Sequence, residues 1–362
     1  MQNNQNILKN HFPTIRSRGE ILSDIQSNIR CKNIFDSWSK NEQELFLSIC
    51  TGTRGLNITY DPFFKEIMNP EYNLERLSNL LSELLEMKVK VLKVLPNDGI
   101  RIANESTLLI TDVVVELENG SIVNVEIQKI GYKFPGERAS CYSADLLLRQ
   151  YKRLRDETKK HFKYSDVKPV YTIILFEKSP KEFHKFPNEY LHFVEGKSNT
   201  GITINTLQKY LFIPLDIFKK IHQNKPISNN KDAWLTFLSA DSPEVIEQLI
   251  LEYPYFKPLY EDIYEMCRNT EAIMGLFSKE LQILDDNTVQ FMIDEMQEEI
   301  NVLRDEVSEK DDAIAEKDKA IAEKDKAIAE KNKAISEKDN TIAKNMILIE
   351  NLKNKLREYE SI

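Results

Sequence analysis

The sequence lacks several features by which a chain of 362 residues is readily assigned to a class. Its four cysteines are scattered, without a C-x2-C pair or a Cys/His cluster, so the sequence indicates neither a zinc site nor a disulfide framework. No apolar run approaches the length of a membrane span, and the first residues lack the apolar core of a signal peptide. We therefore expect a soluble, cytoplasmic protein with no membrane contact.

The chain also lacks an excess of basic residues. Its 49 Lys and Arg stand against 58 Asp and Glu, which gives a formal net charge of −9. This balance excludes a uniformly basic nucleic-acid-binding protein, so any contact with DNA must come from a local patch. Gly52-Thr53-Arg54-Gly55 is not followed by Gly-Lys-Ser/Thr, and we interpret it as a turn rather than a phosphate-binding loop.

The most informative stretch that is present, residues 108–129, predicts two strands joined by a tight turn. In both arms the odd-numbered face is apolar over most of its length, whereas the acidic and amide side chains of the arms, Asp112, Glu116, Asn124, Glu126 and Gln128, are all even-numbered. Side chains that pair across a hairpin share a face, so paired positions must add to an even number. This predicts a three-residue loop, 118–120, closed by Leu117 opposite Ser121, with Gly120 in the left-handed conformation that glycine tolerates.

The predicted register brings polar side chains together on one face of the hairpin. Asp112 lies opposite Glu126, and Gln128 follows on the same face. Two carboxylates directly opposite each other repel unless a positive charge lies between them, and a hard divalent cation with oxygen ligands supplies that charge. The alternative is an ordinary half-solvated hairpin, since antiparallel sheets often expose one face to water.

The pattern D-x13-E-x-Q on adjacent strands resembles the core of the PD-(D/E)XK nucleases. The flanking motifs are Tyr60-Asp61-Pro62-Phe63-Phe64, the Leu-rich segment 74–85, Gly131-Tyr132, Phe134-Pro135-Gly136, Arg138, and CYSADLLLRQYKR at 141–153. Together, over about residues 50–290, these segments resemble the PD-(D/E)XK nuclease family transposases, which are relatives of the recombination-promoting nucleases of bacteria.

The resemblance implies a magnesium-dependent DNA endonuclease, with Mg²⁺ or Mn²⁺ as its cofactor. Asp112 and Glu126 would bind the metal, helped by the backbone carbonyl of Ile127, and Gln128 stands where the motif has lysine. A carboxamide orients a water but cannot take up its proton. A non-catalytic nucleic-acid-binding module, or a coiled-coil scaffold with an inert core, therefore stays an alternative. Glu83 on a helix is a further candidate for the metal site or its support, against an ordinary solvated glutamate.

Periodicity predicts the rest of the fold. Leucines at helical spacing indicate an amphipathic helix over 73–87, and apolar runs indicate strands over 89–95 and 168–176. With a long helix expected over 137–164, the fold class is α/β, with a restriction-endonuclease-like central mixed sheet flanked by helices. Beyond residue 206 the pattern indicates a helical region, which begins with a helix over 207–218.

The long helix expected after the hairpin is rich in basic residues. Its candidate DNA-contacting residues are Arg138, Arg149, Gln150, Lys152 and Arg153. Neutralising phosphates supplies most non-specific DNA affinity, whereas the alternative is a charged face in contact with solvent only. By the resemblance, Arg138 and Gln150 either orient substrate or brace the sheet.

The C-terminal residues follow one a/d heptad frame from Ile293 to Tyr359. Strict seven-residue spacing predicts a long helix of the left-handed coiled-coil type. The repeated IAEKDKA has isoleucine at each a position but lysine at each d position, and lysine at d costs stability. The helix either forms a homo-oligomer or stays a single charged helix that Glu–Lys pairs stabilise.

These patterns divide the chain into four expected parts. Residues 1–50 are a weakly defined N-terminal segment, and 51–205 are the PD-(D/E)XK-like nuclease core. A helical region follows over 206–290. The heptad-repeat coiled-coil tail occupies 291–362.

Overall fold

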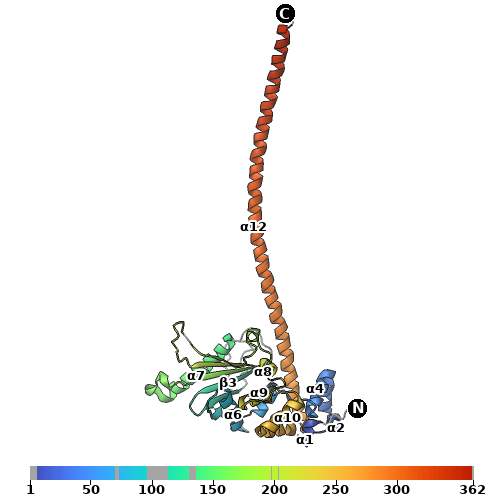
Figure 1. The fold of residues 1–362 in the computed structure, drawn as a ribbon, viewed down its shortest axis with the longest axis vertical. Coiled ribbons are helices and arrows are strands. Elements are labelled where there is room, and N and C mark those ends of the chain that lie inside the picture. Colours follow the sequence, from blue (N-terminus) through green and yellow to red (C-terminus); the bar gives the residue numbers. More distant parts are fainter. Residues whose placement is uncertain are drawn as a thin grey trace. The chain divides into compact units, whose positions relative to one another are not determined.

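The computed structural model describes residues 6–69, 73–95, 113–129, 136–196, 198–202 and 204–360. The protein is a mixed α/β protein, in which helices flank a six-stranded sheet and a long helix ends the chain (Figure 1). This confirms the predicted fold class. The chain separates into two compact units, residues 1–291 and residues 292–362. Within the described ranges, no helix is both long enough and apolar enough to cross a membrane.

Short helices precede the sheet, and sequence signals define their ends. They are α1 (Ile7–His11), α2 (Arg18–Ser27), α3 (Ile29–Ser37), α4 (Lys40–Cys50), α5 (Asp61–Ile67) and α6 (Leu74–Leu84). Ser17 and Ser39 begin α2 and α4 in capping boxes with Glu20 and Glu42. In α6 the leucines at 77, 80, 81 and 84 are buried, as their helical spacing predicted.

The sheet is mixed. Its strands are β1 (Val91–Val94), β2 (Val113–Leu117), β3 (Ile122–Gln128), β4 (Val170–Phe176), β5 (His192–Val194) and β6 (Gln208–Pro214). Their spatial order is β1-β2-β3-β4-β6-β5. β1, β2 and β3 are antiparallel neighbours, β4 is parallel to both β3 and β6, and β5 is antiparallel to β6. The predicted strands over 89–95 and 168–176 are confirmed as β1 and β4.

The hairpin of β2 and β3 has the predicted register. Val113 pairs with Val125, and Glu116 pairs with Ile122. Its three-residue turn closes as expected, because the Leu117 amide donates to the Ser121 carbonyl at 2.8 Å. Gly120 has φ +84°, and a side chain there would be strained. The alternation of apolar and polar residues therefore predicted both the turn and the pairing.

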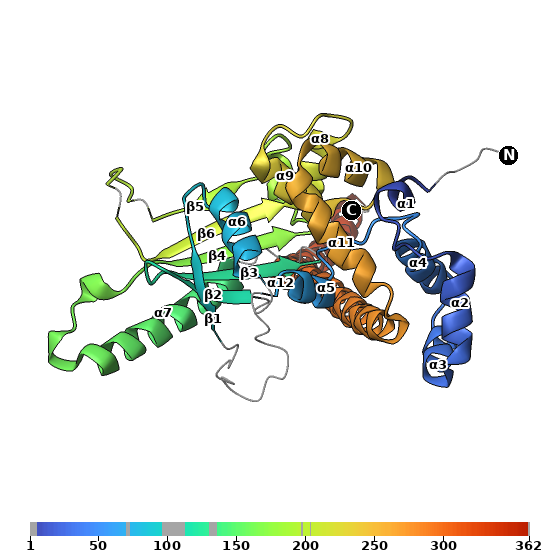
Figure 2. The same cartoon turned by 90° about the horizontal axis from the view of Figure 1, so that it is seen from below.

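Two different layers cover the two faces of the sheet. The odd-numbered residues of β2 and β3 belong to the main hydrophobic core, together with the leucines of α6. On the even-numbered face, Leu146 of α7 (Gly136–Thr158) packs with Val114, Ile122 and Val170. Farther along, Ala139 packs with Ile174, Phe176 and other residues of β4 and β6. α7 runs along the side of the sheet away from α6 (Figure 2).

The helix predicted over 207–218 is wrong in its first half. Residues 208–214 form β6, which pairs with β4 in parallel, and α8 (Leu215–His222) begins directly after Pro214. The run LFIPLDIF is apolar almost throughout, and periodicity alone cannot separate a buried strand from a buried helix in such a run. Residues 208–214 form a strand because their backbone groups pair with the edge of β4 that β3 does not occupy.

Helices occupy the rest of the chain. They are α9 (Asn230–Ser239), α10 (Pro243–Glu252), α11 (Lys257–Met266) and α12 (Thr270–Glu360). Trp234 of α9 is 1% exposed and packs against Phe237 and Phe256, as expected for a core residue. The first turns of α12 share the core of residues 1–291, where Phe277 contacts Trp38 and Phe46.

Candidate functional site

Strand β3 places the candidate residues Glu126 and Gln128 on one face, two positions apart. This face is covered rather than wet: Glu126 is 4% exposed and Asn124 is fully buried. Beside Glu126 lies Ile174 of β4, which also packs with Ala139 of α7. The half-solvated hairpin is therefore wrong for β3, because α7 shields the polar side of the strand.

Asp112, the second candidate carboxylate, lies outside the described residues. The pairing of β2 with β3 is described as far as Val113 opposite Val125, and the next position on β3 is Glu126. The predicted meeting of Asp112 with Glu126 thus stays a prediction.

The described donors suit a hard cation. Glu126 offers a carboxylate and Gln128 a carboxamide, and such cations are bound through oxygen atoms. The Oε1 atom of Gln128 is buried and has no hydrogen-bond partner among the described residues. No group of three His, Cys, Asp or Glu in the described part of the chain could hold a metal ion by itself. The described half of the site therefore fits a metal and requires a further ligand such as Asp112.

Lys129, which follows Gln128, points to the opposite face of the sheet, as strand alternation predicted. Its side chain is 5% exposed and forms an ion pair with Glu280 of α12, whose side chain is fully buried. The Lys129 ammonium also lies 4.4 Å from the centroid of the Tyr60 ring. Lys129 is thus a core residue on the opposite face of the sheet. It does not take the place of the motif lysine, which this chain lacks.

Further polar groups surround this buried pair. The Asp61 amide donates to Glu280 at 3.1 Å, and Asn57 donates to Glu177 at 3.1 Å. Burial raises the pKa of Tyr60, and the negative charge of Glu177 raises it further. We name this set, namely Asn57, Tyr60, Asp61, Lys129, Glu177 and Glu280, the Lys129 cluster.

The Lys129 cluster was not found by sequence analysis. It ties the end of β3 to the start of α5 and to α12, although Lys129 and Glu280 are 151 positions apart. The Tyr60-Asp61-Pro62 motif was a partial signal for it. No local pattern marks Glu280 as the partner.

Two basic candidates on α7 already have acidic partners. Arg149 pairs with Asp145 at 2.8 Å, and Arg153 pairs with Glu116 at 2.8 Å. Lys152 is exposed, and no ion pair joins it to a described residue. The side chain of Arg138 lies outside the described residues.

Gln150 braces the hairpin instead of facing solvent. It is 2% exposed, its Nε2 donates to the Gly120 carbonyl at 3.2 Å, and its Oε1 accepts from the Lys168 amide at 2.6 Å. Of the two roles that the resemblance suggested, this geometry supports bracing the sheet. The turn of the hairpin is thereby tied to the segment that enters β4.

Glu83 is not brought to Glu126. It belongs to α6, which covers the odd-numbered face, whereas Glu126 lies on the even-numbered face under α7. Its carboxylate accepts a hydrogen bond from Asn230 at 3.3 Å in an exposed position. This position favours the alternative of an ordinary helix glutamate over a metal-binding role for Glu83.

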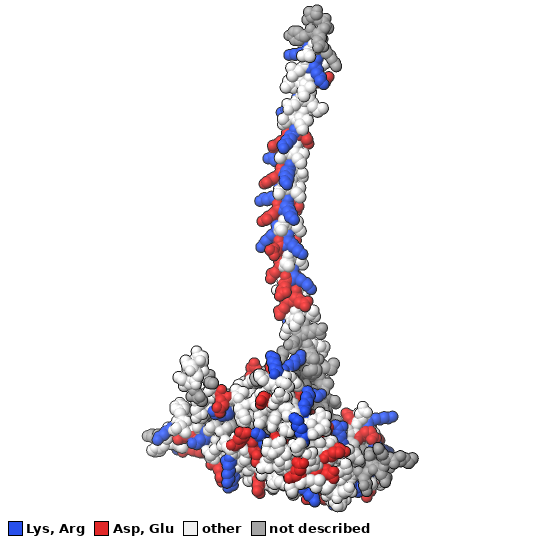
Figure 3. Space-filling model, viewed as in Figure 1, with Lys and Arg blue, Asp and Glu red and all other residues white. Residues whose placement is uncertain are grey.

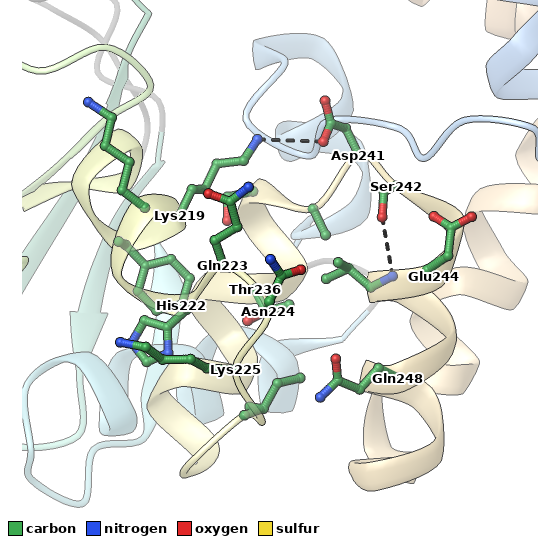
Figure 4. Close-up of a pocket in the computed structure, with 16 residues that line it drawn as sticks. Lys219, His222, Gln223, Asn224, Lys225, Thr236, Asp241, Ser242, Glu244 and Gln248 are labelled. Atoms are coloured by element: carbon green, nitrogen blue, oxygen red, sulfur yellow. Dashed lines mark hydrogen bonds and ion pairs between the residues drawn. The ribbon is translucent and has the colours of Figure 1, made fainter.

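A separate pocket of about 570 Å³ lies among α8, α9 and α10, and no predicted site residue lines it (Figure 4). Its charges are mixed: Lys219 reaches Asp241 at 3.6 Å, and Ser242 accepts the Val245 amide in the cap of α10. These groups satisfy one another, and we assign no chemistry to this pocket.

Comparison with known proteins assigns most of the first unit to a described family. The family model described as "PD-(D/E)XK nuclease family transposase" matches residues 59–296, more than half of the chain. A search of curated proteins finds no match.

Proposed function

Because this chain belongs to the PD-(D/E)XK nuclease family transposases, we propose that it is a metal-dependent DNA endonuclease that hydrolyses phosphodiester bonds. Membership of the family supports a function of the nuclease or transposase type. Dependence on Mg²⁺ or Mn²⁺, catalytic competence and the individual site residues are the further steps of this proposal.

The observation that carries the proposal is the covered polar face of β3. The Glu126 carboxylate is 4% exposed, and carboxylate oxygens are the ligands that a hard divalent cation prefers. The described register ends at Val113 opposite Val125, and its continuation by one residue would bring Asp112, which lies outside the described residues, opposite Glu126. Two opposing carboxylates and a carboxamide in one shielded place suit a divalent cation better than they suit a structural role.

In this proposal Asp112 and Glu126 hold the metal, and the Ile127 carbonyl is the third protein ligand. When bound, a divalent cation would supply positive charge at the phosphate and would lower the pKa of a water. Gln128 would orient that water, either by accepting a hydrogen bond from it or by donating one to it. As a carboxamide, Gln128 cannot take up a proton from the water. α7 excludes bulk water from this face, which strengthens every charge interaction beneath it.

The proposal is tested by incubating the purified full-length chain with supercoiled plasmid, with Mg²⁺ and with EDTA. We expect cutting only with the metal, and its loss in Glu126→Gln and Asp112→Ala, because one remaining acid binds a hard cation weakly. Glu118→Gln is the matched control, since Glu118 lies in the turn of the same hairpin and pairs with exposed Lys90. Undiminished cutting by Glu126→Gln would show that the assignment is wrong.

Gln128 offers a finer test of the same site. Gln128→Ala should lower the rate by about 10²-fold or less, the lower end of what acid–base groups contribute, because this residue only orients. Gln128→Lys restores the residue of the motif. A rate equal to or above that of the parent would place residue 128 at the catalytic position.

The alternative is a non-catalytic nucleic-acid-binding protein, or a coiled-coil scaffold, that keeps the nuclease fold. The observation in its favour is Gln128 itself, which leaves the site without the motif's lysine. DNA binding in EDTA without any cutting in Mg²⁺ would favour the binding protein. Absence of both would favour the scaffold.

For DNA contact we propose α7, with the exposed Lys152 and with Arg138, Arg149 and Arg153 of the same helix. The last two are about one third exposed and can exchange their carboxylate partners for phosphate. In this scheme Gln150 supports the surface from below.

We further propose that residues 291–362 join two copies of the chain, and that 51–205 and 206–290 are the nuclease core and its helical extension. The a-position isoleucines from Ile314 to Ile342 are 54–56% exposed in a single chain, so one helix alone cannot bury them. Each lysine at d is followed by an acid or amide at e, such as Asp318 after Lys317. In a parallel pair the e residues flank the partner's d residues and can compensate their charge.

A further inference from the structure

Three aromatic rings form a compact group at the end of α7. The ring of Tyr151 is nearly parallel to that of Tyr164, with an interplanar angle of 11° and centroids 6.1 Å apart. Phe162 stands edge-on to both, at 5.3 Å and 5.4 Å. The three rings belong to α7 and to the segment that leads from it to β4, and we name them the aromatic platform.

The outer member of the platform is open to solvent although its position is fixed. Tyr164 is 78% exposed, the highest exposure among the described large apolar and aromatic side chains. It begins a short 3-10 turn, Tyr164–Asp166, which the Lys163 amide closes onto the Asp166 carboxylate at 3.0 Å. The next residue, Val167, is buried and anchors the turn. A ring held in this way is available for contact with little loss of conformational entropy.

Several cations that have no acidic partner among the described residues lie close to the platform in the sequence. Lys152, Arg155, Lys159 and Lys163 are exposed, and none of them forms an ion pair with a residue in the described ranges. Arg155 instead donates to the Tyr151 hydroxyl at 3.3 Å. Over residues 151–166 there are six Lys and Arg against three Asp and Glu, within a chain whose net charge is −9. The platform thus lies in a local basic patch of an acidic protein.

We propose that the aromatic platform binds unpaired nucleobases of a single strand, with Tyr164 as the stacking surface and the flanking cations on the phosphates. This assignment rests on the proposed action on DNA. Aromatic rings beside a positively charged track are how proteins hold single strands without reading their sequence, because every base has a stacking face. In a duplex those faces are covered by neighbouring bases, so the platform distinguishes unpaired from paired strands.

The platform lies at a useful distance from the candidate site. From Ala139, which packs beside the Glu126 region, to Tyr151 the helix rises by about 18 Å at 1.5 Å per residue. Stacked nucleotides advance by about 3.4 Å each, so about five of them span this length. A strand cut near Glu126 would therefore be held a few nucleotides away, along α7.

The test is the affinity of the full-length protein for a fluorescent oligo-dT of about 12 nucleotides, measured by anisotropy in EDTA. Loss of one stacked base is worth about 1–3 kcal/mol, so Tyr164→Ala should weaken binding by roughly 5- to 150-fold. Tyr164→Phe, which keeps the ring, should bind like the parent. Lys163→Gln should lower the slope of log affinity against log salt by about 0.7.

Matched controls separate stacking from general damage. A blunt duplex of the same length should bind Tyr164→Ala and the parent equally. Phe186→Ala removes another exposed aromatic side chain, 57% exposed, and should change nothing. An oligo-U strand tests whether the platform distinguishes ribose from deoxyribose. If Tyr164→Ala weakens the binding of oligo-U as much as that of oligo-dT, the platform binds either nucleic acid. A smaller loss of affinity for oligo-U means that the platform prefers DNA.

Two results would overturn the platform: parental binding of oligo-dT by Tyr164→Ala, or an equal loss for duplex and single strand. Because EDTA prevents metal-dependent cutting, this readout is independent of the plasmid assay. Failure to cut plasmid with a clear effect at Tyr164 would reject the nuclease and keep the platform. Normal cutting with no effect at Tyr164 would do the reverse.

Discussion

Lys129 and Lys310 each pair with a glutamate, yet the two pairs belong to opposite environments. In residues 1–291 the side chains of Lys129 and Glu280 are 5% and 0% exposed. In residues 292–362 those of Lys310 and Glu306 are 73% and 56% exposed, at 3.7 Å. A buried ion pair is costly to break because an unpaired charge is left in the core, whereas water replaces either partner of an exposed pair. The same chemical pair is thus structural in one unit and nearly neutral in the other.

The isoleucines differ between the two units in the same way. Ile173 and Ile213 of the sheet are fully buried by their own chain, whereas Ile321 and Ile328 of the tail are 56% and 54% exposed. Along the tail, basic and acidic side chains alternate around the helix (Figure 3). The first unit completes its core alone, and the tail can complete one only with a second helix.

The largest expected effect is on the buried pair. Lys129→Met should destabilise residues 1–291 by about 3–5 kcal/mol, because Glu280 is left buried without its cation. Lys310→Met, the matched exposed variant, should cost less than about 0.5 kcal/mol. Both tryptophans, Trp38 and Trp234, lie in the first unit, so tryptophan fluorescence in urea measures the effect of Lys129→Met, and the loss of helical circular dichroism in urea measures the effect of Lys310→Met on the tail.

A second variant shows whether the charge or the packing causes the loss. Adding Glu280→Gln to Lys129→Met removes the stranded charge, and the pair of changes should recover part of the stability. Equal losses in Lys129→Met and Lys310→Met would contradict the contrast between the two units.

What the sequence predicted well is local. The β2–β3 hairpin follows from the even-numbered positions of its acidic and amide residues and from one glycine, and α6 and the tail follow from the spacing of Leu and Ile. The candidate pair Glu126 and Gln128 was found in the same way, since two residues on one strand face need only period two. That α7 covers this face was not predicted, because alternation gives the polarity of a face and not its burial.

What was missed depends on contacts that are distant in the sequence. β6 looked helical because the apolar run gives no period, and only its pairing with β4 makes it a strand. No local pattern around Glu280 in α12 distinguishes it from an exposed helix glutamate. It is buried because it contacts Lys129, which is 151 positions away in the sequence. For Gln150 the sequence left two roles open, orienting substrate or bracing the sheet. Its hydrogen bond to the Gly120 carbonyl, which the sequence does not reveal, favours bracing.

An intermediate effect is expected at the d positions of the tail. Lys324→Leu makes one d position of the tail apolar, so that both a and d are apolar in that heptad. Burial of a leucine contributes about 1.5–3 kcal/mol. Association of two chains should tighten by about tenfold or more, measured by sedimentation equilibrium. Lys326→Leu lies in the same heptad at f, on the outer side, and should leave association unchanged. If neither change, or both equally, altered association, the heptad seam would not be the contact.

The smallest expected effect is that of the whole tail on the first unit. The buried residues described in the structure all precede residue 281, so removal of residues 301–362 takes none of them away. The free energy of unfolding of the remaining chain should therefore stay within about 0.5 kcal/mol of the full-length value, the range of surface changes. Tryptophan fluorescence in urea measures this stability, and sedimentation of the same sample should show that self-association has been lost. A truncated protein that is unfolded or insoluble would contradict two separate units, and one that still associates would move the contact out of the tail.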